Sequence, residues 1–169
     1  MKKNLLIFGA GQYGQVAKEI AKSTKNFNRI EFLDDNNEKA IGKICEYKKF
    51  KKEFSTAFVA IGNVEIRLKL IEELDGQGFE VVKIVSPTAQ VSPSAQVKSG
   101  TIVEHMAVIS ANSFVGEGVF VCAGAIVNHN ATVGDGCQID CGSVVGSNAV
   151  VPPKTKLAYN EVFYKQEER

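Results

Sequence analysis

The sequence is poor in several residue types that mark particular classes of protein. It has no tryptophan, two histidines, four prolines and four cysteines in 169 residues. The cysteines are Cys45, Cys122, Cys137 and Cys141, and because no two of them form a CxxC pair we expect reduced, cytoplasmic thiols. No apolar run approaches the roughly 18 residues that span a bilayer, so no membrane partner is expected. Twenty basic and nineteen acidic side chains nearly cancel, which leaves no broad positive field for nucleic acid.

Charge and hydrophobic pattern divide the chain near residue 84. Residues 1–84 carry 15 basic and 12 acidic side chains, whereas residues 85–169 carry 5 and 7. Hydrophobic residues make up 44% and charged residues 23% of the sequence, which is typical of a folded, soluble protein. We therefore expect two small domains over residues 1–84 and 85–157, followed by a tail over residues 158–169.

The second half is a repeat with a period of six. An aliphatic residue stands at every sixth position from Val85 to Leu157 and fills thirteen consecutive slots without a break. A small residue follows four places after most of them, as at Ala107 and Ser143. A fixed period indicates a solenoid, because the turns of a sandwich hold no constant spacing. Strand side chains alternate, so inward positions four residues apart need a corner between them, and three sides then close a triangular coil. Thirteen hexads give about four coils, a prism roughly 20 Å tall.

The first half alternates strand-like and helix-like segments in a βαβαβ pattern. The expected strands cover residues 5–8, 29–33, 56–61 and 79–82. Helices are expected over about residues 15–23 and 65–74. This order of elements is typical of a Rossmann-like half domain.

A glycine motif lies between the first expected strand and the first expected helix. Gly9, Gly11 and Gly14 match G-x-G-x-x-G, and Asp34 lies 20 residues beyond Gly14. Backbone N–H groups in such a turn can hold a phosphate at a helix N-terminus, and the acid can meet a ribose. The 84 residues available supply one mononucleotide-binding half, which favours a nucleotide sugar over NAD. An alternative is that the glycines only permit a close turn between strand and helix.

Both halves resemble known proteins. The hexads resemble the hexapeptide-repeat acyltransferases, which fold as left-handed parallel β-helices. With the first half included, the chain resembles the PglD/NeuD-like sugar acetyltransferase family. The resemblance is carried by residues 7–14, 32–35, 60–67, 85–87 and 127–129. It implies an α/β Rossmann-like half domain followed by a left-handed β-helix of about four coils. It also implies a homotrimer, a UDP-linked amino sugar as substrate and acetyl-CoA as co-substrate, without a metal.

The resemblance assigns roles to residues of the first half. In the family this half binds the nucleotide sugar. The corresponding residues here are Gly11, Gln12, Tyr13, Asp34, Asp35, Gly62 and Glu65. All follow the carboxyl ends of expected strands, where open α/β sheets bind their ligands. Taken alone, Asp34, Asp35 and Asn36 are also compatible with a solvated turn.

His129 is the candidate catalytic base. Acetyl transfer to an amine needs a neutral nitrogen, and imidazole, with an unperturbed pKa near 6.5, can take up the proton around neutral pH. His105 occupies the same slot of the hexad, but one coil and one side earlier, so the two rings point from different faces. That placement argues against a metal site in one subunit and leaves His105 at the surface. By resemblance, Gln138, Gly146 and Ser147 would contact acetyl-CoA, with a backbone N–H near Gly146 and Ser147 stabilising the oxyanion.

The sequence departs from the family pattern at three places. Asn130 follows His129 where the family commonly has an acid, and an amide can orient imidazole without stabilising imidazolium as a carboxylate does. Gln138 stands where the family has a second histidine, and the hexads end early, at Leu157.

We predict direct acetyl transfer, with His129 as the base, in the synthesis of a bacterial glycan precursor. Covalent transfer through Cys137 or Cys141 is disfavoured, because Cys137 fills an inward slot and no histidine neighbours Cys141 in sequence. Two alternatives stay open. One is a non-catalytic nucleotide-sugar-binding or assembly module with a degraded acetyl-CoA site, and the other is a sialic-acid-type O-acetyltransferase.

Overall fold

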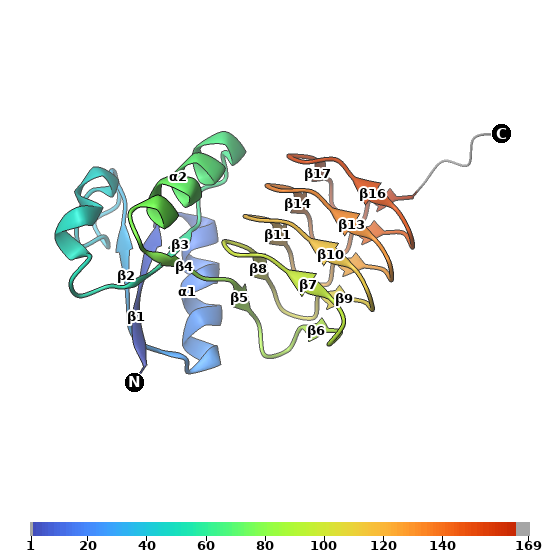
Figure 1. The fold of residues 1–169 in the computed structure, drawn as a ribbon, viewed down its shortest axis with the longest axis horizontal. Coiled ribbons are helices and arrows are strands. Elements are labelled where there is room, and N and C mark those ends of the chain that lie inside the picture. The colour runs from blue at the N-terminus through green and yellow to red at the C-terminus, as the bar shows by residue number, and fades with distance from the viewer. Residues whose placement is uncertain (1, 165–169) are drawn as a thin grey trace. The chain divides into compact units, whose positions relative to one another are not determined.

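The fold is an α/β unit followed by a left-handed parallel β-helix, as the computed structural model in Figure 1 shows. The structure describes residues 2–164. The chain divides into two compact units with the boundary between Ile84 and Val85. No helix within the described residues is long and apolar enough to cross a bilayer.

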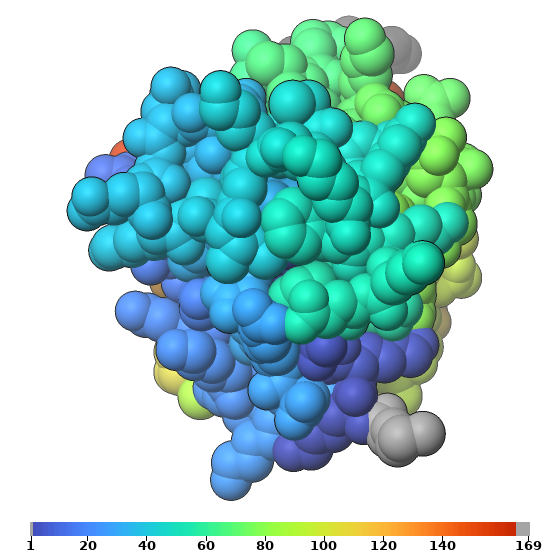
Figure 2. Space-filling model, turned by 90° about the vertical axis from the view of Figure 1, so that its left-hand side faces the viewer, coloured from blue at the N-terminus to red at the C-terminus, as the bar shows by residue number. Residues whose placement is uncertain are grey.

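The N-terminal unit is built on a parallel four-stranded sheet with strand order β2-β1-β3-β4. In chain order its elements are β1 (Lys3–Phe8), α1 (Gln12–Thr24), β2 (Phe27–Leu33), the 3-10 helix η1 (Ile44–Phe50), β3 (Thr56–Val59), α2 (Val64–Gly76) and β4 (Glu80–Val81). The segment between β2 and β3, which includes η1, forms much of the face shown in Figure 2. Its Tyr47 is buried against Phe8 and Phe79, so this unpredicted segment closes one side of the core.

The predicted elements of this unit are all present, with shifted ends. Helix α1 begins at Gln12 instead of about residue 15, because Gly11 is extended and the chain turns directly into the helix. Strand β3 ends at Val59 instead of residue 61, because its partner β1 ends at Phe8 and offers no further backbone to pair with.

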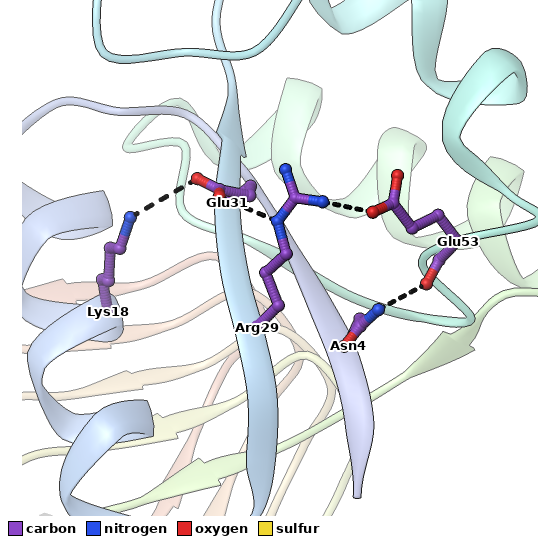
Figure 3. A network of polar contacts seen from close by, with 5 residues as sticks. All are labelled: Asn4, Lys18, Arg29, Glu31 and Glu53. Carbon is purple, nitrogen blue, oxygen red and sulfur yellow. Dashed lines mark hydrogen bonds and ion pairs between the residues drawn. The ribbon is translucent and has the colours of Figure 1, made fainter.

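Strand β2 forms one edge of the sheet and carries a charged network (Figure 3). Arg29 Nε donates to Glu31 at 3.0 Å, and the same guanidinium pairs with Glu53. Lys18 of α1 lies 3.8 Å from Glu31, and Asn4 of β1 donates to the Glu53 carbonyl at 2.9 Å. Charged side chains on an edge strand discourage pairing with a second chain, so the network protects this edge.

The C-terminal unit stacks two-residue strands into three parallel sheets. The sheets have the orders β17-β14-β11-β8-β5, β18-β15-β12-β9-β6 and β16-β13-β10-β7. The strands are β5 (Ile84–Val85), β6 (Gln90–Val91), β7 (Gln96–Val97), β8 (Ile102–Val103), β9 (Val108–Ile109), β10 (Phe114–Val115), β11 (Phe120–Val121), β12 (Ile126–Val127), β13 (Thr132–Val133), β14 (Gln138–Ile139), β15 (Val144–Val145), β16 (Val150–Val151), β17 (Lys156–Leu157) and β18 (Val162–Phe163). Each pairs with the strand one coil further on, as Val115 does with Val133.

The hexad residues fill the inside of this prism. The aliphatic residues from Val103 to Leu157 are no more than 1% exposed, and small residues such as Ala125 and Ser143 are fully buried beside them. The third residue after each aliphatic position takes the left-handed conformation at the corner from Gly100 to Asn160. Glycine and asparagine tolerate this conformation best, which explains why they fill most of these positions with the period of the hexad, Met106 and Lys154 being the exceptions.

The β-helix extends one strand further than predicted. Strand β18 pairs with β15, and Phe163 packs against the core one hexad after Leu157. The predicted end of the β-helix at residue 157 is therefore wrong. The next hexad position holds the aromatic Phe163, whereas the predicted pattern was aliphatic. The rest of the predicted tail, residues 165–169, lies outside the described residues.

Candidate functional site

The three glycines of the motif have different structural roles. Gly9 has φ +102°, and a Cβ on Gly14 would lie 2.1 Å from the Gly9 carbonyl oxygen, so the fold itself requires both glycines. A Cβ on Gly11, in contrast, would meet nothing within 4 Å. Gly11 is also the N-cap of α1 and supplies no side-chain cap to the helix. The motif therefore leaves open space beside Gly11, at the N-terminus of a helix, where N–H groups have no partner within the helix.

The two predicted acids hold different parts of the backbone. Asp34 Oδ2 accepts from the Ala10 N–H at 2.7 Å, and its Oδ1 accepts from the Asn36 N–H at 2.9 Å. Asp35 Oδ1 instead accepts from the Ile44 N–H at 3.0 Å, at the start of η1. Asp34 is therefore in contact with the glycine turn, whereas Asp35 braces the segment that follows β2.

The loop after β3 completes the same edge of the sheet. A Cβ on Gly62 would lie 3.4 Å from the Tyr13 ring, so Tyr13 of α1 lies against this loop. Arg67 is 1% exposed, and its Nη1 donates to the carbonyls of Ile61 at 2.7 Å and Gly62 at 3.0 Å. The structure therefore brings Tyr13 and Gly62 together at the strand ends.

Sequence reasoning assigned no role to Arg67. The signal was its spacing, because Arg67 falls in line with Leu70, Ile71 and Leu74 on the buried face of α2. An arginine in such an apolar series needs buried acceptors, and the loop carbonyls supply them. Of the other predicted residues, Gln12 and Glu65 are exposed in the first turns of α1 and α2.

His129 lies on an exposed corner of the β-helix between β12 and β13. Its Nδ1 is 3.0 Å from Asn130 Nδ2, and its Nε2 is 3.0 Å from Ser147 Oγ. Asn130 holds the left-handed corner, with φ +57°. The structure thus joins three predicted residues in one cluster. The contact with Ser147 was not foreseen, although the 18 residues between them place both side chains on the same corner of neighbouring coils.

Two of the residues predicted to contact acetyl-CoA have other partners. The Gly146 N–H donates to the Phe163 carbonyl at 2.7 Å, as part of the ladder between coils. The prediction that it stabilises an oxyanion is therefore wrong, which leaves the Ser147 N–H as the donor to consider. Gln138 lies in β14, in a different sheet from β12, is 9% exposed and donates to Asp140 at 2.7 Å. The structure does not bring Gln138 to His129.

Two cysteines within the β-helix, Cys122 and Cys137, are poor nucleophiles. Burial raises the pKa of the Cys122 thiol far above its usual range and also raises the pKa of Cys137. Both thiols therefore stay protonated near neutral pH, when only a thiolate would attack. Cys137 is fully buried in the inward slot predicted for it.

His105 belongs to a second hydroxyl-bonded corner. Its Nδ1 lies 2.9 Å from Ser86 Oγ and 3.0 Å from Thr88 Oγ1. The ring follows β8, whereas His129 follows β12, and these strands belong to different sheets. The prediction that the two histidines point from different faces is confirmed. Among residues 2–164, no group of three histidine, cysteine or acidic side chains is arranged to hold a metal ion.

Comparison with known proteins gives consistent matches to both units. Residues 4–74 match the PglD N-terminal domain. Two structures of the acetyltransferase domain of PglB from Neisseria gonorrhoeae FA1090 are similar to the whole chain. The complex with acetyl coenzyme A is 23% identical over 98% of this chain and 94% of that one, with a TM-score of 0.77. The second structure is 26% identical over 95% and 93%, with a TM-score of 0.70.

A further similar structure is PerB from Caulobacter crescentus in complex with CoA and GDP-perosamine. It is 22% identical over 95% of this chain and 91% of that one, with a TM-score of 0.71. The family match in the first unit and these likenesses over nearly the full length agree with each other. The first unit therefore matches the PglD N-terminal domain, and the whole chain shares the fold of these sugar acetyltransferase structures, which supports a PglD/NeuD-like protein.

Proposed function

We propose that this protein transfers the acetyl group of acetyl-CoA to the amine of a UDP-linked amino sugar. The observation that carries the proposal is the His129 cluster, in which an exposed imidazole is held at both ring nitrogens on a corner of the β-helix. The PglB domain binds acetyl coenzyme A, and PerB binds CoA with GDP-perosamine, an amino sugar nucleotide. These relatives support transfer from acetyl-CoA to a nucleotide-linked amino sugar here, and the choice of UDP follows the family resemblance.

The N-terminal unit supplies the features that a nucleotide sugar needs. Gly11 leaves space beside the N-terminus of α1, where N–H groups and the helix dipole favour a diphosphate. Asp34 and the buried Arg67 hold the two loops that border this turn. We assign Gly11, Gln12 and Tyr13 to the diphosphate or sugar, Asp34 to the uridine portion, and Gly62 and Glu65 to the same crevice. Asp35 is a weaker candidate for the uridine portion, because its carboxylate accepts a hydrogen bond from the Ile44 N–H at the start of η1.

In the β-helix unit, His129 acts as the general base for a direct transfer. The amine attacks the thioester carbonyl carbon, a C–N bond forms, and the C–S bond breaks to release CoA. The reaction needs a group that removes the amine proton, and an imidazole has a suitable intrinsic pKa. The raised pKa values of Cys122 and Cys137 support direct transfer over an acyl-cysteine intermediate. Gln138 and Ser147 stand as acetyl-CoA contacts from the family pattern, with the Ser147 N–H as the oxyanion donor.

We also propose a homotrimer that works in the cytoplasm. One sheet of the prism carries an aliphatic stripe on its outer face, formed by Val108, Ile126, Val144 and Val162. Ile126 is 36% exposed and Val162 is 55% exposed, so the stripe offers apolar area to a second copy of the chain. The free thiols of Cys45, Cys122, Cys137 and Cys141 agree with a reducing compartment.

The test is release of the CoA thiol from acetyl-CoA in the presence of a panel of UDP-linked and GDP-linked amino sugars. We expect turnover with a UDP-linked member, and loss of about 10²- to 10⁴-fold in His129→Ala, the usual contribution of a general base. His105→Ala is the matched control, because it removes the other hydroxyl-bonded histidine. Equal rates for wild type and His129→Ala would remove His129 from this role. Tight binding of a UDP-sugar without thiol release would instead support the non-catalytic module.

A further inference from the structure

Both nitrogens of the His129 ring are engaged by neighbouring side chains. Asn130 holds Nδ1 at 3.0 Å, and the Ser147 hydroxyl holds Nε2 at 3.0 Å. An amine that gave its proton directly to the ring would first have to displace one of these partners. The hydroxyl of Ser147 is a different case, because a hydroxyl donates one hydrogen bond and accepts others at the same time.

We propose that Ser147 relays the proton between the acceptor amine and His129. This inference rests on the proposed role of His129 as the base. Ser147 is half-buried, so part of the residue is open to solvent. In the relay, the side of its hydroxyl that faces away from His129 meets the amine. The amine hydrogen-bonds to Ser147 Oγ, and Ser147 hydrogen-bonds to Nε2. His129 can then take up the amine proton through Ser147 while its contacts with Asn130 and Ser147 are both kept.

The relay balances without another reactant. As the amine nitrogen attacks the thioester carbon, its proton moves to Ser147 Oγ, and the original hydroxyl proton of Ser147 moves to His129 Nε2. The ring is then an imidazolium, held at Nδ1 by Asn130. When the C–S bond breaks, the Nε2 proton returns to Ser147 Oγ, and the proton that Ser147 took from the amine passes to the departing thiolate sulfur. The ring and the serine end as they began, and no bond to Ser147 carbon or oxygen is made to the acetyl group.

The relay specifies one tautomer of His129. Nε2 can accept a proton only if Nδ1 carries the ring hydrogen, and Asn130 must then present its carbonyl oxygen to Nδ1. The orientation with Nδ2 facing the ring gives the opposite tautomer. A half-turn of the amide exchanges the two atoms with almost no change of shape. Asn130 therefore fixes the hydrogen of the His129 ring on Nδ1, and Ser147 then passes its proton to the free Nε2.

The kinetic test compares Ser147→Ala with Ser147→Thr. We expect the alanine variant to lose about 10²-fold in kcat with an unchanged KM for the amino sugar, in the range of one step of acid–base catalysis. Threonine restores a hydroxyl, so kcat returns towards the wild-type value. Thr88→Ala is the matched control, because it removes a hydroxyl 3.0 Å from the other histidine. A wild-type kcat for Ser147→Ala, or a loss confined to KM, would overturn the relay.

A spectroscopic test does not depend on turnover. We expect nitrogen NMR of the ring at alkaline pH, where an ordinary imidazole is neutral, to show His129 with a protonated Nδ1 and an unprotonated Nε2. Ser147→Ala should shift the Nε2 signal, and Thr88→Ala should leave it in place. A ring protonated at Nε2 would refute the relay even if the enzyme is active. If the wild type acetylates no amino sugar, the proposed function fails, and the tautomer alone decides the assignment of Ser147.

Discussion

Gly11 and Gly14 allow folding and ligand binding to be separated by two substitutions within one motif. In Gly14→Ala the new Cβ would lie 2.1 Å from a backbone oxygen, more than 1 Å closer than ordinary van der Waals contact. The strand and the helix must then move apart, and we expect a loss of about 3 kcal/mol in the free energy of unfolding, the upper part of the range for overpacking. This variant should fail in folding and binding alike.

Gly11→Ser should behave in the opposite way. A Cβ at Gly11 meets nothing within 4 Å, the backbone angles are ordinary, and serine is a better N-cap than glycine by a few tenths of a kcal/mol. The free energy of unfolding should therefore stay equal or rise slightly. If the space in front of α1 holds the nucleotide sugar, the same side chain intrudes on it, and we expect affinity to fall at least about tenfold, or 1.4 kcal/mol.

Urea unfolding and calorimetric titration with the UDP-sugar identified by the thiol-release assay would measure both quantities. The informative result is the pair of values for Gly11→Ser. A variant that is stable and binds the nucleotide sugar as tightly as the wild type would refute the placement of the ligand at this helix end. A variant that is as unstable as Gly14→Ala would refute the distinction between the glycines.

Four further substitutions test the β-helix. Ile139 is fully buried, so Ile139→Ala should lower the free energy of unfolding by about 2–5 kcal/mol, whereas Val150→Ala, at a side chain that is 64% exposed, should change it little in chemical denaturation. Ile126→Lys places a charge in the aliphatic stripe and should reduce the trimer in analytical ultracentrifugation, and an unchanged trimer would exclude the stripe from the interface. Burial raises the pKa of Glu104, so its protonated form is favoured by the fold, and stability is lost as pH rises through that pKa. Glu104→Gln should therefore raise stability at neutral pH and flatten its decline between acid and neutral pH, which thermal unfolding across that range would measure.

The repeat was predictable because its rule is local. Each inward side chain from Val85 to Leu157 obeys the same spacing, and a coil packs only against the next coil. Phe163 has the same spacing, and it was missed only because its side chain is aromatic and not aliphatic. The segment with η1 was not predictable in this way, because Tyr47 is buried through contacts with Phe8 and Phe79, which are distant in sequence.

The candidate sites also contain features that local spacing predicts and features that depend on contacts distant in sequence. Gly9 and Gly14 follow from the motif, since a turn between adjacent elements determines them. The bond from His129 to Ser147 follows from the period once the corner is recognised, because residues 18 apart stack on neighbouring coils. The engagement of the Gly146 amide with Phe163 could not be predicted while the last strand, β18, was missing from the prediction.

Asn130 shows how the corner geometry and the chemistry constrain the same residue. The left-handed corner favours glycine, asparagine or aspartate, and only the last two can reach the ring. Asn130→Asp should therefore fold normally and place a carboxylate beside Nδ1, where it stabilises the imidazolium. Because the corner is exposed, solvent screens the pair, and we expect the interaction to contribute about 0.2–1 kcal/mol. The proton NMR signals of the His129 ring should shift in this variant, with His105 in the same sample as the internal control. Aspartate also accepts a hydrogen bond from Nδ1, so this variant keeps the tautomer that the relay needs. Unshifted NMR signals of the His129 ring would show that residue 130 does not hold the ring in solution.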